Sequence, residues 1–164
     1  MAAWLHEQGH NATVVVGGEG PFCDALEERK VPYIVSEYLS RPIHLARDAL
    51  AVAELRRIFR REHPSLITLH SAKAGLVGRL ASIGLNVPVL FTAHGWSFTE
   101  GVSPRKARLF RFLERAVAPL AERIITVSEY DRSLAIDAGI ASAERLKTIH
   151  NAMPDVPSRA TPGN

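Results

Sequence analysis

An α/β domain built on a parallel sheet is the fold class that this sequence predicts, from three observations. Short β-branched and aliphatic runs alternate with stretches whose apolar residues recur at helical spacing. The loops between these segments are short. The strand candidates are nearly continuous apolar runs, which is typical of strands buried on both faces. Together they predict a parallel sheet with helices on both of its faces.

The expected elements follow one another along the chain to about residue 150. Strands are expected at Ala12–Val16, Val31–Val35, Leu66–His70, Val87–Thr92, Arg123–Val127 and Leu146–His150. Helices are expected at Ala2–Gln8, Phe22–Arg29, Ile43–Arg61, Ser71–Ile83, Ser103–Leu120 and Ser128–Ala138. From residue 152 the chain is rich in Pro, Ser and Gly, so we expect one domain over residues 1–151 and a linker or loose tail over 152–164.

Composition excludes several classes of protein. The net charge of +3 over 164 residues suits phosphates or an anionic membrane surface, but it is too small to indicate a nucleic-acid partner. Cys23 is the only cysteine, which excludes an internal disulfide and favours a reducing, cytoplasmic setting. The N-terminal stretch "MAAWLHEQGH" has no basic segment and no long apolar segment, so we do not expect it to be a signal peptide. No apolar run approaches the roughly 18 residues that span a bilayer. Any membrane contact, on the inner face of the plasma membrane, is therefore expected to be peripheral.

The carboxyl ends of parallel strands are where such sheets bind ligands. This rule selects five loops, and histidines begin three of them: Gly17–Pro21, His70–Gly75, His94–Ser103, Ser128–Glu129 and His150–Asn151.

The loop "HGWSFTEG" is the strongest candidate for a ligand site. Its histidine, His94, follows a strand, and Gly95 would let the backbone turn sharply. An imidazole can bond a sugar hydroxyl or pair with a phosphate, and Trp96 and Phe98 could stack on a sugar ring or an apolar tail. The structural alternative is a histidine bonded to a nearby carbonyl, with both aromatic rings packed under the loop. The richness of the loop favours function.

Two other strand ends carry weaker signals. In "HSAKAG", His70, Ser71 and Lys73 stand where free helix N–H groups attract an anion, although a capping serine and a solvated lysine explain the same residues. Ser128 and Glu129 could face the same crevice or simply cap a helix.

The Gly-rich stretch "VVVGGEGPFC" does not fit a dinucleotide-binding loop. Cys23 stands where the third glycine of G-x-G-x-x-G should be, so a tight turn with positive φ is the better interpretation.

A basic amphipathic helix is expected at Ser103–Val117. Its arginines and lysine alternate with leucine and phenylalanine, which suits an anionic membrane surface as well as an ordinary helix covering the sheet. The membrane-facing candidates are Arg105, Lys106, Arg108 and Arg111.

Several stretches, in their order along the chain, resemble the N-terminal half of family 4 glycosyltransferases, the large retaining group with the two-domain GT-B fold. They are "LHEQGHNATVVVGGEGP", "HSAKAGLVGRLA", "VPVLFTAHGWSFTEG", "RIITVSEYDR" and "IHNA". The resemblance covers residues 5–151 and implies a Rossmann-like domain that serves the acceptor, while a C-terminal domain binds the nucleotide-sugar. It implies sugar transfer without a metal and with retention of the anomeric configuration.

The resemblance also implies roles for individual residues. His94 would be the catalytic cleft histidine, next to the donor sugar and phosphate. Substrate-binding roles would fall to His70, Ser71, Lys73, Gly95, Trp96, Phe98, Thr99, Ser128, Glu129 and Asn151.

Two departures from the family pattern matter. The family begins with a strand and a glycine-rich loop before its first helix, whereas Met1 already stands at that helix. That strand is normally central, so its absence is expected to leave the neighbouring strands with unpaired edges. The C-terminal donor domain is not in the sequence either.

We therefore expect the acceptor half of a retaining glycosyltransferase, inactive as this chain alone. The full enzyme would use a UDP- or GDP-sugar, no metal, and a lipid-linked or polysaccharide acceptor. The alternatives are a non-catalytic module that pairs with a separate donor subunit or a membrane, another GT-B enzyme such as an epimerase or phosphorylase, and a dinucleotide-binding oxidoreductase domain.

Overall fold

The computed structural model describes residues 1–40, 42–99 and 101–152. Its helices are α1 (Ala2–Glu7), α2 (Pro21–Glu28), α3 (Leu45–Glu62), α4 (Ala72–Ala81), α5 (Pro104–Val117), the 3₁₀ turn η1 (Ala118–Leu120) and α6 (Glu129–Asp137). Its strands are β1 (Val14–Val16), β2 (Tyr33–Val35), β3 (Ile67–His70), β4 (Val89–Ala93), β5 (Arg123–Thr126) and β6 (Leu146–Thr148). Every element expected from the sequence is present, with ends shifted by a few residues. The expected tail lies, apart from Ala152, outside the described residues.

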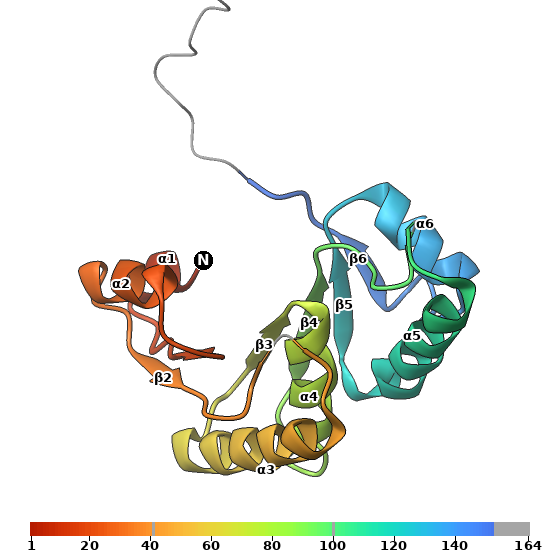
Figure 1. Ribbon diagram of the computed structural model, residues 1–164. Helices are drawn as coiled ribbons and strands as arrows, with labels where there is room; N and C mark the ends of the chain where they lie inside the picture. Colours follow the sequence, from red (N-terminus) through yellow and green to blue (C-terminus); the bar gives the residue numbers. More distant parts are fainter. Residues whose placement is uncertain (41, 100, 153–164) are drawn as a thin grey trace, which may run out of the picture.

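All of the strand pairs are parallel, as the alternation of strands and helices predicts. The strands form two separate ladders, β1–β2 and β3–β4–β5–β6. Figure 1 shows β1 and β2 with α1 and α2 as a unit to one side of the four-stranded sheet, with α3 running below both. Within the described residues, β1 and β3 each pair along one edge only. Unpaired strand edges of this kind were expected from the sequence.

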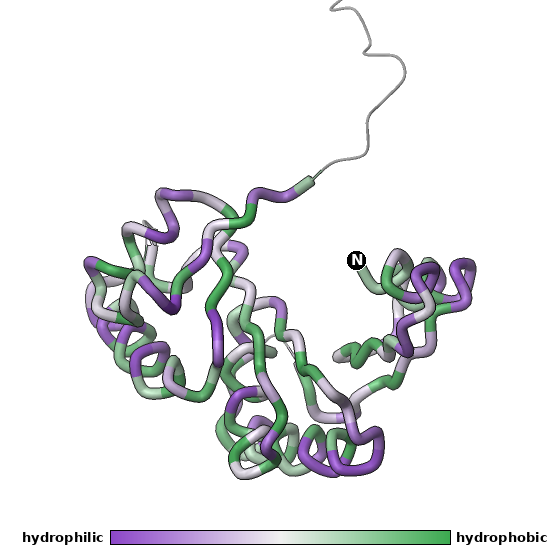
Figure 2. Tube along the Cα trace, turned by 180° about the vertical axis from the view of Figure 1, so that it is seen from behind, coloured by the Kyte–Doolittle hydropathy of each residue, from purple (hydrophilic) through white to green (hydrophobic). Residues whose placement is uncertain are grey.

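One large apolar core joins the four-stranded sheet to the helices around it. Alternate residues of β4 are buried, and Phe91 at the strand centre is 1% exposed. The long helix α3 contributes Leu55 and Phe59 to the same core. In Figure 2 the hydrophobic residues recur along the strands, while hydrophilic residues gather on outer helix turns. A second, smaller core holds α2 against β1 and includes the buried Cys23.

Two glycines let α4 lie directly on the sheet. A Cβ at Gly75 would overlap the ring of Phe91 on β4, and a Cβ at Gly78 would overlap the Leu69 side chain on β3. The glycines of "HSAKAGLVG" thus allow close packing of helix on strand. This contact fixes the start of α4, and with it the loop that follows β3, at the carboxyl end of the sheet.

The Gly-rich turn after β1 behaves as the sequence predicts. Gly18 has φ +144°, which favours glycine, and its carbonyl accepts a weak hydrogen bond from the buried Sγ of Cys23 at 3.6 Å. Cys23 therefore serves the packing of this turn.

Candidate functional site

The candidate site lies where β3 and β4 end side by side. The two strands are in register with His70 opposite Thr92, so His94, two residues further on, comes next to His70. Nδ1 of His70 lies 3.2 Å from Nε2 of His94, and the ring centroids are 5.5 Å apart. The strand-end rule predicted that these loops share an edge, but it did not predict direct contact between the histidines.

The two histidines differ in their surroundings. His94 is exposed, whereas His70 is half-buried and its Nε2 has no hydrogen-bond partner among the described residues. Burial lowers the pKa of His70 below its usual value, and the neighbouring His94 and the N-terminal amino group lower it further. His70 is therefore held neutral more firmly than a free histidine.

Backbone conformation shapes both loops. Gly95 has φ +125°, so a glycine is needed for the sharp turn directly after His94. Ser71 has φ +75°, a conformation that is strained for a residue with a side chain and is found mainly at functional sites. These two residues set the directions in which the chain leaves His70 and His94.

The polar residues after β3 already have partners within the chain. The Ser71 hydroxyl caps α4 by accepting from the Ala74 N–H at 3.4 Å. Nζ of Lys73 lies 2.6 Å from the Asp48 carboxylate of α3, and both side chains are largely buried. Asp48 was not identified from the sequence, because it precedes Lys73 by 25 residues. An anion at this loop would have to compete with Asp48 for Lys73.

Trp96 and Phe98 do not offer their rings to a ligand, contrary to the stacking role expected for them. Each is only 4% exposed, and their rings stack on each other with centroids 5.5 Å apart. The Trp96 indole N–H donates to the Asp131 carbonyl of α6 at 2.9 Å. Because a ring buried on the core has no free face, these aromatics anchor the loop, as the structural alternative proposed. Thr99, half-buried, donates to the Trp96 carbonyl at 2.9 Å.

The remaining predicted site residues follow β5 and β6. The Ser128 hydroxyl caps α6 by accepting from the Asp131 N–H at 3.0 Å, and it donates to the Asp131 carboxylate. Glu129 and Asn151 are exposed. Because β5 lies beside β4 and β6 beside β5, these residues stand in sequence along the same edge as His94.

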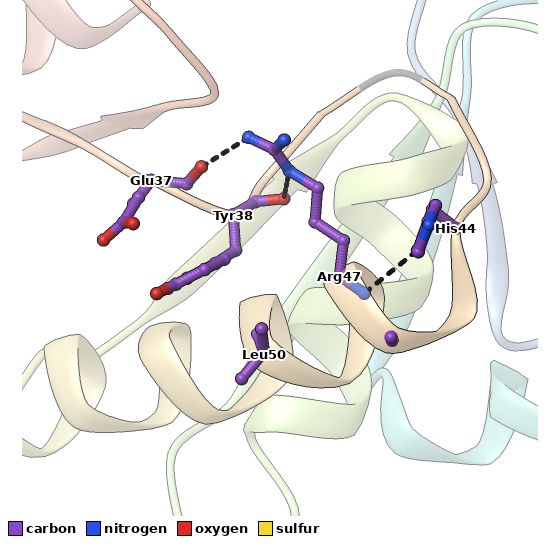
Figure 3. A pocket seen from close by; sticks show the side chains of 6 residues that line it. Glu37, Tyr38, His44, Arg47 and Leu50 are labelled. Carbon is purple, nitrogen blue, oxygen red and sulfur yellow. Dashed lines mark hydrogen bonds between the residues drawn. The ribbon is translucent and has the colours of Figure 1, made fainter.

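A separate pocket of about 270 Å³ lies at the start of α3 (Figure 3) and is lined by Glu37, Tyr38, His44, Ala46, Arg47 and Leu50. The Arg47 guanidinium is the group there that could bind an anion, but it donates to the carbonyls of Glu37 at 2.7 Å and Tyr38 at 3.2 Å. We therefore assign Arg47 a structural role, in which its two hydrogen bonds hold the loop after β2 against α3.

The described part of the chain has neither a metal-binding cluster nor a membrane-spanning helix. No group of three or more His, Cys, Asp or Glu side chains there is placed to hold a metal ion. No helix there combines the length and apolar composition that crossing a bilayer requires.

Comparison with known proteins identifies the family. The profile of the family described as "Glycosyl transferase 4-like domain" matches residues 1–152. The chain is 26% identical over 150 residues to the UDP-Gal:alpha-D-GlcNAc-diphosphoundecaprenol alpha-1,3-galactosyltransferase of Escherichia coli, covering 91% of this chain and 38% of that enzyme. It is 27% identical over 110 residues to the O-antigen biosynthesis glycosyltransferase WbnH of Escherichia coli, covering 67% of this chain and 32% of the relative.

Solved structures of HepE match at an identity similar to that of the sequence relatives. HepE of Anabaena, in complex with UDP and glucose, matches with a TM-score of 0.64 and 26% identity, over 87% of this chain and 37% of HepE. The chain thus spans about two fifths of the length of the proteins it resembles. A family profile of glycosyl transferases that covers nearly the whole chain favours the glycosyltransferase prediction over the epimerase, phosphorylase and oxidoreductase alternatives. The chain therefore belongs to the glycosyl transferase 4-like domain family of GT-B glycosyltransferases.

Proposed function

We propose that this chain is the acceptor-side domain of a retaining glycosyltransferase that moves a sugar from a UDP- or GDP-sugar to a lipid-linked or polysaccharide acceptor. The observation that carries the proposal is the contact between His70 and His94 at the carboxyl ends of β3 and β4. An exposed imidazole there can bond a hydroxyl or a phosphate oxygen, the groups that sugar transfer brings together. The names of the relatives support a diphosphate-linked lipid acceptor and a surface polysaccharide product.

The division of labour within the proposed enzyme is the one that the family resemblance implies, and the share of the relatives that this chain covers supports it. The donor would be held by a second domain, in the same polypeptide or in a separate subunit, and residue 151 marks the proposed boundary of the acceptor domain. Residues of the loops after β3, β4, β5 and β6 would line the acceptor side, with no metal involved. The alternative function, a non-catalytic module that pairs with a donor-binding subunit, would use the same surface. It differs from the proposed enzyme only in that no sugar is transferred.

Ligand titration of the isolated chain tests this division. We expect a short-chain polyprenyl-diphosphate N-acetylglucosamine to shift the amide resonances of residues 70–75 and 94–99, whereas UDP-galactose leaves them unchanged. We also expect no transfer of labelled sugar by the chain alone. The variant His94→Ala should weaken acceptor binding, and His10→Ala, an exposed histidine that precedes β1 and lies outside these loops, is the matched control. Tight binding of UDP-galactose with turnover would show that the chain serves the donor as well.

We also propose that the exposed face of α5 contacts an anionic membrane. Its basic side chains are all exposed, and two apolar ones stand among them: Leu109, 52% exposed, and Phe112, 65% exposed. Four of the five basic residues are the membrane-facing candidates Arg105, Lys106, Arg108 and Arg111, and the fifth, Arg115, donates from Nε to the Ala138 carbonyl at 2.7 Å. Cations around exposed apolar side chains fit a surface of anionic headgroups over acyl chains. If the acceptor is lipid-linked, it is anchored in the membrane, so the site has to lie close to the membrane surface.

Charge reversal on α5 should weaken vesicle binding. Each basic residue near an anionic surface contributes about 1 kcal/mol, so Arg108→Glu with Arg111→Glu should lower affinity for phosphatidylglycerol-rich vesicles by at least about tenfold. The control pair Arg60→Glu and Arg61→Glu, exposed at the end of α3, changes net charge equally. Co-sedimentation at low and high salt measures the effect. An equal loss from both pairs would mean that net charge, and not this face, governs binding.

A further inference from the structure

We infer that His70 donates a hydrogen bond from its Nδ1–H to Nε2 of His94 and so fixes neutral His94 in the tautomer that carries its proton on Nδ1. His70 is then a positioning residue, and His94 presents an N–H donor on its other ring nitrogen. The inference rests on the proposed function in one respect, namely that His94 is the histidine that contacts the ligand.

Only one proton fits between the two rings. The 3.2 Å separation of Nδ1 of His70 and Nε2 of His94 is a hydrogen-bond distance, so one of these nitrogens donates and the other accepts. Either His70 donates from Nδ1, or His94 donates from Nε2. The two arrangements differ in where each ring keeps its single proton.

The buried nitrogen of His70 distinguishes the two arrangements. If His94 were the donor, His70 would accept at Nδ1, and its own proton would be on Nε2. That atom is buried and meets no acceptor among the described residues, so the N–H would be orphaned. Buried N–H groups without an acceptor are rarer in proteins than buried acceptors without a donor. If His70 donates, its only N–H is used and Nε2 carries a bare lone pair.

A third possibility, in which both nitrogens of His70 carry a proton, is disfavoured. Burial disfavours the imidazolium form of His70, and a positive charge on His94 or on the N-terminal amino group disfavours it further. His70 therefore has one proton to place, and Nδ1 is the position where it is satisfied.

The consequence concerns what His94 can do. With Nε2 occupied as an acceptor, the free nitrogen of His94 is Nδ1–H, a donor on an exposed ring. A donor in this place suits an oxygen with lone pairs, such as a sugar hydroxyl or a phosphate oxygen, and it does not suit removal of a proton from the acceptor. His70 thus selects hydrogen-bond donation over general-base action for His94.

The tautomer can be measured directly in the chain as it exists. The spectra are recorded on histidine-labelled protein at about pH 8.5, roughly two units above the usual imidazole pKa. Long-range ¹H–¹⁵N correlation spectra then distinguish the two tautomers, and His94→Gln assigns the signals. We expect the Nδ1–H pattern for His94. An Nε2–H pattern would overturn the inference.

A matched pair of variants at His70 tests the cause. Asn places an amide nitrogen close to the position of Nδ1 and can still donate, whereas Leu has the same size and cannot donate. We expect His70→Asn to keep the Nδ1–H pattern of His94, and His70→Leu to release His94 into a mixture of tautomers. The inference fails if His70→Leu keeps the pattern or if His70→Asn loses it, in variants that melt near the wild-type temperature.

A pH titration of the same spectra gives a second readout. Because the charge of His94 lowers the pKa of His70, His94→Gln should raise the midpoint at which His70 protonates, and an unchanged midpoint would contradict the contact. None of these measurements needs sugar transfer. A transferase in which His94→Ala is fully active would therefore refute the proposed function while leaving the tautomer result intact.

Discussion

Replacing His94 with alanine, in an enzyme that joins this domain to a donor-binding domain, should lower turnover by about 10²- to 10³-fold, the usual cost of losing one hydrogen-bond donor to developing charge. The expected change in the free energy of unfolding is below about 1 kcal/mol, because His94 is exposed and its side chain meets only one hydrogen-bond partner among the described residues, His70. Initial rates with labelled nucleotide-sugar, together with urea unfolding of each variant, measure both quantities.

The matched control is His10→Ala, another exposed histidine that lies away from the strand ends. It should leave both rate and stability unchanged. A variant His94→Ala that loses melting temperature together with activity would make His94 a structural residue. Turnover of His94→Ala equal to that of the control would remove it from the catalytic site.

The fold was predictable because its signals are local. Apolar runs, helical spacing and punctuation by proline and glycine depend on neighbours in sequence, and each predicted strand and helix is present. The site was predictable only as an edge of the sheet, since the carboxyl ends of parallel strands come together whatever side chains they carry. Predicting the contact between His70 and His94 also requires the register of β3 and β4, which no local sequence pattern encodes.

The errors have the same physical origin. Trp96 appeared to be a loop aromatic available to a ligand, but its indole N–H bonds a carbonyl 35 residues further along the chain, at Asp131. Lys73 was expected either to bind an anion or to be solvated, but it meets Asp48 on another helix. In each case a distant partner decides what the side chain does. The general rule that a buried polar group needs a partner applies to both residues, but it does not say which residue the partner is.

Arg79 is the most deeply buried charged residue whose partner is distant in sequence, and it was not identified from the sequence. It is fully buried in α4, where Nε donates to the Gly75 carbonyl and Nη2 to the Glu114 carboxylate of α5, each at 2.7 Å. Its guanidinium also lies 4.2 Å above the centre of the Phe91 ring. Burial lowers the pKa of Arg79, and the charge and hydrogen bond of Glu114 oppose that shift. The pair thus joins α4, the helix that carries the loop after His70, to α5.

Replacing Arg79 with methionine should reduce the free energy of unfolding by about 3 to 5 kcal/mol, because Glu114 would be left as a buried charge without its cation. The double variant Arg79→Met with Glu114→Leu should recover most of that loss, since both desolvated charges are then removed. Recovery is favoured further by Nη1 of Arg79, which is buried and meets no acceptor in the described part of the chain.

Urea unfolding of both variants beside Lys73→Met decides between a structural ion pair and simple packing. The Lys73–Asp48 pair is less deeply buried, with side chains 14% and 17% exposed, so its loss should cost less than that of Arg79. A double variant as unstable as Arg79→Met alone would mean that the shape and stacking of Arg79, and not the unpaired Glu114 charge, account for the loss. Because α4 packs on Phe91 through Gly75, we expect Arg79→Met also to loosen the start of α4, visible as faster amide exchange in the loop after β3.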